Sequence, residues 1–66
     1  MPGGENMIQE IIDKFTIFLY NNNITQGEAA EKIECSQEHL SRVLRGQRTP
    51  STKLLMKMEK YMEAHE

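Results

Sequence analysis

The chain has 66 residues, a formal net charge of −2 and a single cysteine. This length is enough for one small domain, and one cysteine excludes an internal disulfide. The longest apolar run, residues 17–20, is far too short to span a bilayer, so we expect no membrane contact and a cytoplasmic protein. The potential metal ligands Cys35, His39 and His65 lack the spacing of a metal site, and we expect no metal and no cofactor.

The charges are distributed unevenly along the chain. Residues 1–35 contain six acidic and two basic residues, whereas residues 36–66 contain six basic and four acidic residues. All three arginines fall within positions 42–48. Because the field at a surface depends on where the charges lie, the C-terminal half suits a polyanionic partner despite the negative net charge.

The chain opens with a segment that has two glycines and no hydrophobic periodicity, and we expect residues 1–6 to be a disordered leader. From Met7 onward, apolar residues recur at steps of three and four, which predicts an amphipathic helix. These residues are Ile8, Ile11, Ile12, Phe15, Phe18 and Leu19. The three asparagines at 21–23 predict its end, because asparagine tolerates left-handed backbone geometry.

Two short helices are predicted next. Thr25 and Glu28 have the spacing of a capping box, which predicts a helix of about two turns from Gln26. Its buried face would be Ala29, Ala30 and Ile33. Ser36 is an N-cap candidate for a third helix, whose apolar face would be Leu40, Val43 and Leu44, and Gly46 is placed to terminate it.

A fourth helix is predicted after Pro50 and Ser51, since proline and serine are typical of helix starts. Its apolar stripe would be Leu54, Leu55, Met58, Tyr61 and Met62. No segment has the pattern of a strand. The fold class expected for the chain is therefore all-α.

The link between the second and third helices is only about three residues long, which forces a large crossing angle. Such a pair is typical of the DNA-binding helix-turn-helix, here at about residues 25–45. The small side chains of Ala29 and Ala30 suit a close crossing, although alanine is also simply a good helix former.

This stretch resembles the helix-turn-helix of the Cro/C1-type (XRE-like) repressor family. The elements that carry the resemblance are Thr25-Gln26, Ala30, Cys35-Ser36, Leu40-Ser41-Arg42, Arg45-Gly46 and Pro50-Ser51. With the flanking helices it covers about residues 8–62. It implies a compact four-helix, lambda-repressor-like domain over residues 7–66. Two departures are that Glu34 replaces the turn glycine of the family and that the usual fifth helix is missing.

The resemblance implies that the helix from Gln37 enters the DNA major groove with its N-terminal end. Base contacts are then expected from Gln37, Glu38, Ser41 and Arg42, whose side chains can bond base edges. A carboxylate at a helix N-terminus also interacts favourably with the helix dipole, so Glu38 has a second interpretation. Contacts to the DNA backbone are expected from Gln26, Arg45, Arg48 and Thr49.

Some apolar residues are not needed for a minimal core, and they suggest a homodimer interface. They are Ile17, Tyr20, Leu54 and Tyr61. A domain of this size benefits from additional burial, and a twofold dimer would read a near-palindromic operator. The alternative is that these residues only widen the core stripe.

Two classes of function remain. The pattern favours a sequence-specific transcriptional regulator, with repression by operator occupancy, in a phage or mobile element, a restriction system or a toxin–antitoxin pair. The alternative is a protein-interaction module on the same scaffold. An enzyme is disfavoured, because neither a catalytic triad, paired buried carboxylates nor a phosphate-binding loop is recognisable, and no small-molecule substrate is evident.

Overall fold

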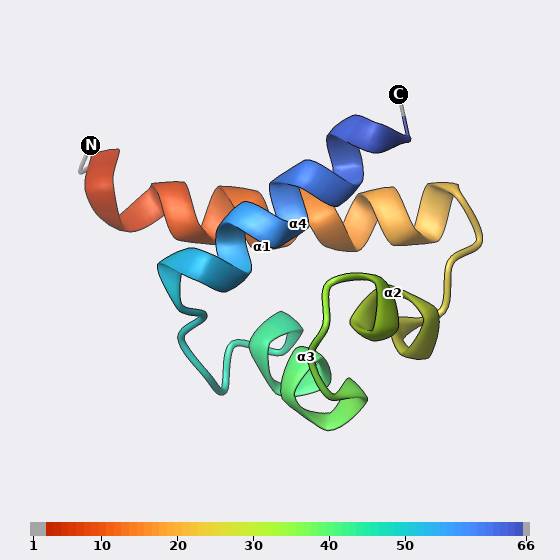
Figure 1. The fold of residues 1–66 in the computed structure, drawn as a ribbon. Helices are drawn as coiled ribbons and strands as arrows, with labels where there is room; N and C mark the ends of the chain where they lie inside the picture. The colour runs from red at the N-terminus through yellow and green to blue at the C-terminus, as the bar shows by residue number, and fades with distance from the viewer. Residues whose placement is uncertain (1–2, 66) are drawn as a thin grey trace.

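The computed structural model describes residues 3–65, which form four helices and contain no strand. Helix α1 spans Gly3–Asn21, α2 Gln26–Lys32, α3 Gln37–Leu44 and α4 Thr52–Ala64. In Figure 1, α4 crosses α1, and the short helices α2 and α3 lie together beneath α1. The predicted all-α fold with four helices is confirmed.

The start of α1 differs from the prediction. The helix begins at Gly3, four residues before Met7, where the hydrophobic pattern starts. Extending an existing helix costs less than nucleating a new one, so residues without an apolar pattern can continue a helix. The boundary between a leader and the domain at residues 6 and 7 stays a prediction, and residues 1, 2 and 66 lie outside the described part of the chain.

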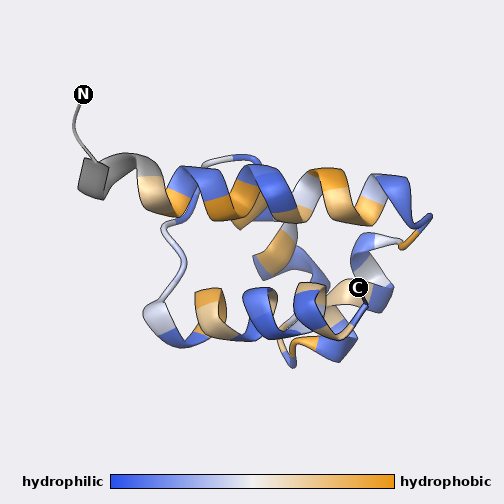
Figure 2. Cartoon of the chain, turned by 90° about the horizontal axis from the view of Figure 1, so that it is seen from above, coloured by the Kyte–Doolittle hydropathy of each residue, from blue (hydrophilic) through white to orange (hydrophobic). Residues whose placement is uncertain are grey.

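One hydrophobic core joins the four helices. Its buried members are Ile12, Phe15, Leu19, Ala29, Ala30, Ile33, Leu40, Val43, Leu54 and Met58. Ala29 and Ala30 are almost completely buried in the shortest helix. Figure 2 shows the hydrophobic residues of α1 concentrated on the side that faces the other helices. Burying about ten apolar side chains drives the folding of so small a domain.

Three of the helices end in the same way, with one residue of left-handed backbone. Asn23 follows α1 with φ 56°, Glu34 follows α2 with φ 60° and Gly46 follows α3 with φ 82°. In each case the next amide donates back into the helix: Ile24 N to Leu19 O, Cys35 N to Ala30 O and Gln47 N to Arg42 O, all at 2.9 Å. These are Schellman motifs, which satisfy carbonyl groups at helix C-termini and reverse the chain sharply.

Candidate nucleic-acid interface

Side-chain caps fix the starts of α2 and α3. Glu28 N donates to Thr25 Oγ1 at 3.1 Å and Thr25 N donates to Glu28 Oε1 at 3.4 Å, which confirms the capping box. At α3, His39 N donates to Ser36 Oγ at 3.1 Å. Because these caps accept hydrogen bonds from backbone amides in the first turns of both helices, the side chains at the start of α3 are held on an ordered backbone.

The turn between α2 and α3 is held by a buried residue and a strained one. Ile33, the C-cap of α2, is only 1% exposed. Glu34, which replaces the turn glycine of the family, has left-handed backbone with φ 60°. A side chain in this conformation costs on the order of 1 kcal/mol. The turn keeps the helix-turn-helix geometry despite this substitution.

A shallow concave surface lies over the exposed side of α3. Its lining residues come from the start of α2, from α3 and from the turn after α3, and they are Gln26, Gln37, Glu38, Ser41, Arg42, Arg45 and Gln47. All four predicted base-contacting residues and two of the predicted backbone-contacting residues therefore meet on one surface.

The other two predicted backbone-contacting residues lie at the margin. Arg48 lines an adjoining hollow together with Ser36, Glu38, His39 and Arg42. Thr49 is exposed and borders neither hollow. Sequence reasoning missed Gln47, which lines the concave surface although only Arg45, Arg48 and Thr49 were expected to contact DNA after the third helix. The signal was available, since a left-handed glycine turns the following residue back toward the helix that it ends.

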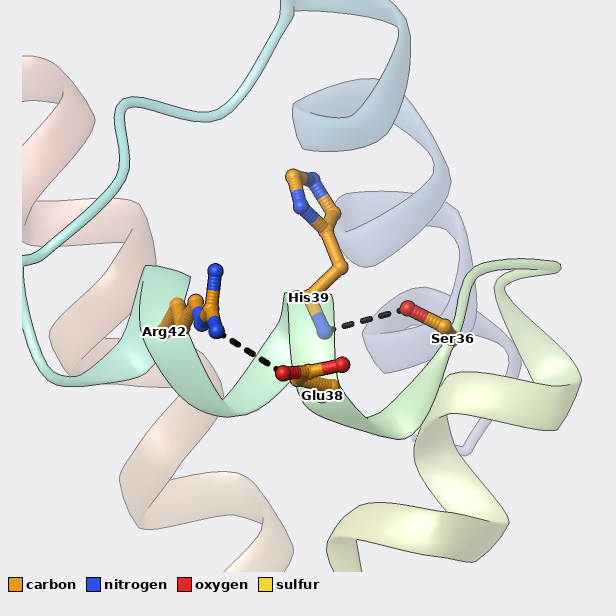
Figure 3. A network of polar contacts seen from close by, with 4 residues as sticks. All are labelled: Ser36, Glu38, His39 and Arg42. Carbon is orange, nitrogen blue, oxygen red and sulfur yellow. Dashed lines mark hydrogen bonds and ion pairs between the residues drawn. The ribbon is translucent and has the colours of Figure 1, made fainter.

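Within this surface, Glu38 and Arg42 form an ion pair. Arg42 Nη2 donates to Glu38 Oε2 at 2.8 Å, one turn apart on α3 (Figure 3). The two side chains are 48% and 75% exposed for Arg42 and Glu38, so the pair contributes only about 0.3–0.5 kcal/mol to stability. In this arrangement the pair directs the guanidinium of Arg42 toward Glu38.

The side chain of Gln37 lies against the first turn of α2. A Cβ placed on Gly27 would come within 3.2 Å of Gln37 Oε1 and 3.6 Å of its Cδ. Because Gly27 has no side chain, the Gln37 carboxamide can occupy this position. Together with Gln26, which lines the same surface, this contact brings the starts of the two helices together.

The positive charge around α3 is only partly neutralised. Arg42 is paired with Glu38, whereas no ion pair is formed by Arg45 or Arg48 among the described residues. Both of these arginines are exposed. The concave surface therefore contains one paired arginine, Arg42, and, within residues 3–65, one arginine outside any such pair, Arg45, while Arg48 borders the adjoining hollow.

His39, on α3, and Cys35, in the turn before α3, also border the start of α4. In Figure 3 the His39 side chain points away from Glu38 and Arg42. Both residues line a small cleft against the start of α4, together with Lys57. Burial raises the pKa of the Cys35 thiol, and the positive charge of Lys57 opposes this effect. The described residues contain no group of three side chains able to hold a metal ion.

The four residues predicted for a dimer interface separate into two pairs. Leu54 is only 7% exposed and belongs to the core, so its interpretation as an uncovered residue is wrong. Its side chain, near the start of α4, packs into the hydrophobic core. Tyr61 is half-buried, with its ring 5.6 Å from that of Phe18. Ile17 and Tyr20 remain exposed, at 58% and 84%.

The comparisons with known proteins identify the family. The Helix-turn-helix family model HTH_3 matches residues 19–65, a span that includes α2, α3 and α4. The chain belongs to this Cro/C1-type helix-turn-helix family, whose members are DNA-binding regulators. Neither a curated protein nor a solved structure gives a significant match to the chain. Within the described residues, no helix combines the length and apolar character that crossing a membrane requires.

Proposed function

We propose that the chain is a sequence-specific transcriptional regulator that binds double-stranded DNA through α3. The observation that carries this proposal is the concave surface in which Gln37, Ser41 and Arg42 lie between Gln26 and Arg45. Glutamine can bond adenine N6 and N7, and arginine can bond guanine O6 and N7. The role requires access to DNA, which fits a cytoplasmic protein without enzymatic activity.

Arg45, Arg48 and Thr49 are the proposed contacts to the phosphate backbone after the recognition helix. The first two are exposed, form no ion pair among the described residues and follow α3 directly. Gln26 is proposed to meet a phosphate from the start of α2. Such contacts fix the register of the protein on the duplex without reading its sequence.

We further propose that a homodimer binds a near-palindromic operator and represses by occupying it. One recognition helix reads only a few base pairs, whereas a twofold pair doubles the site. The domain measures 33 × 25 × 19 Å. Two such domains placed side by side are therefore compatible with recognition helices one DNA turn apart, about 34 Å.

Selection from a random duplex library tests the proposed function. Wild-type protein should enrich one motif with related halves, and Arg42→Ala should relax the preference at one base pair of each half. Arg48→Ala is the matched control: it should weaken binding to all duplexes alike and retain the motif. Failure of the wild-type protein to enrich any motif would contradict the proposal, and enrichment by Arg42→Ala of the unchanged motif would contradict the orientation of α3.

A further inference from the structure

The ion pair between Glu38 and Arg42 lies where the proposed function places base recognition. Both residues line the concave surface over α3, and Arg42 Nη2 donates to Glu38 Oε2 at 2.8 Å. An arginine has five N–H donors in a rigid planar fork. A contact through one terminal nitrogen to one carboxylate oxygen leaves other donors of the guanidinium available to a guanine.

The pair also restricts what Arg42 can bind. A long exposed arginine is normally free to reach a nearby phosphate, as we propose for Arg45 and Arg48. To do so, Arg42 would have to leave Glu38, and the carboxylate would then face the polyanion without a partner. A guanine edge can accept hydrogen bonds from Arg42 without breaking the pair. Glu38 therefore penalises the sequence-independent contact more than the sequence-specific one.

We propose that Glu38 is a positioning residue that holds Arg42 for guanine and keeps it from the phosphates. Sequence discrimination then depends on Glu38 acting through Arg42, and not on a base contact of its own. This inference rests on the proposed function and adds the determinant of its specificity. It also assigns a role to an acidic side chain on a surface that is expected to meet DNA.

The test compares Glu38→Gln with wild type on two duplexes, the selected operator and a scrambled sequence, at one salt concentration. Glu38→Gln should bind the scrambled duplex more tightly and the operator no better. The specificity ratio, which is the Kd for the scrambled duplex divided by the Kd for the operator, should therefore fall about tenfold. Glu59→Gln removes the same charge from an exposed position on α4, and it should leave the ratio unchanged.

The same substitution in the Arg42→Ala background separates positioning from direct reading. If Glu38 acts through Arg42, Glu38→Gln should not change the ratio further when Arg42 is absent. An NMR spectrum of the free protein adds a readout without DNA: the Arg42 Nε–H signal should shift and become more mobile in Glu38→Gln, while circular dichroism stays unchanged.

Two results would overturn the role of Glu38. One is a wild-type ratio in Glu38→Gln, and the other is an equal loss of the ratio with and without Arg42, which would make Glu38 a reader of bases. Both are distinct from failure of the proposed function, in which wild-type protein would prefer neither duplex.

Discussion

Glu34 Oε1 and Lys57 Nζ lie 3.0 Å apart and join the turn of the helix-turn-helix to α4. Glu34 is the residue with left-handed backbone that replaces the turn glycine of the family. The strain at such a position is on the order of 1 kcal/mol, and a surface ion pair, here between the exposed Glu34 and the half-buried Lys57, contributes up to about 1 kcal/mol. The pair therefore offsets part of the strain and connects the turn to α4 through Lys57, 23 residues further along the chain.

Comparison of two substitutions at Glu34 measures both effects. Glu34→Ala loses the ion pair and keeps the strain, so it should lower the free energy of unfolding by up to about 1 kcal/mol. Glu34→Gly loses the pair but relieves the strain, and it should be more stable than Glu34→Ala by about 1 kcal/mol. Urea denaturation measures the difference. Equal stability of the two variants would contradict a strained turn.

Glycines 27 and 46 should respond in opposite directions to alanine. Gly27→Ala gains helix propensity, up to about 1 kcal/mol, which raises Tm by up to about 4–8 °C. The new Cβ, at 3.2 Å from Gln37 Oε1, requires that carboxamide to shift by a few tenths of an ångström and should weaken operator preference at the base pair read by Gln37.

Gly46→Ala is the control for this substitution. Its Cβ would meet nothing within 4 Å, but the backbone has φ 82°. It should therefore lower Tm and leave the preference intact, since only strain is added. A Gly27→Ala protein with unchanged preference at every base pair would argue against base reading by Gln37.

The Cys35 thiol should react slowly at neutral pH. Burial raises its pKa, and the thiolate is the reactive form, so alkylation at pH 7–8 should be slower than for an exposed thiol. Because the raised pKa means that the folded state favours the protonated thiol, its contribution to stability is present below the pKa of the unfolded chain. It is lost as the pH rises through the raised pKa of the folded thiol. Rapid alkylation of the folded protein at pH 7 would contradict this account.

Charged substitutions on α1 test the dimer that we propose. Ile17→Glu and Tyr20→Glu replace exposed side chains, so each should leave the folded monomer intact. If the dimer uses this face, sedimentation should show monomers for both variants and dimers for wild type.

Tyr61→Glu cannot serve as a clean test, because Tyr61 contacts Phe18 and lies close to His65 and Phe15 within the monomer. Lys60→Glu, at an exposed and already charged position of α4, is the control and should remain dimeric. Dimers of both Ile17→Glu and Tyr20→Glu would exclude this face.

Local signals in the sequence predicted most of the fold. The caps at Thr25 and Ser36 and the left-handed residue Gly46 are short-range features, and each was confirmed. The sequence left two interpretations of Leu54 open, burial in a wide core stripe or a place in a dimer interface, because spacing along α4 does not show how far α1 and α3 cover that helix. The Glu38–Arg42 pair could have been inferred from its four-residue spacing, but Glu38 was considered only as a base contact or as a partner of the helix dipole, and Arg42 only as a base contact.

The central claim is that the surface of α3 binds DNA, and the salt dependence of binding to the selected operator tests it most directly. If a dimer neutralises about six phosphates, log K should fall with log salt at a slope near −5. Removing Arg45 and Arg48 together should take away about two contacts from each protomer and flatten the slope by about 3 to 4. Absence of binding at low salt, or a slope that is the same with and without these two arginines, would contradict the claim.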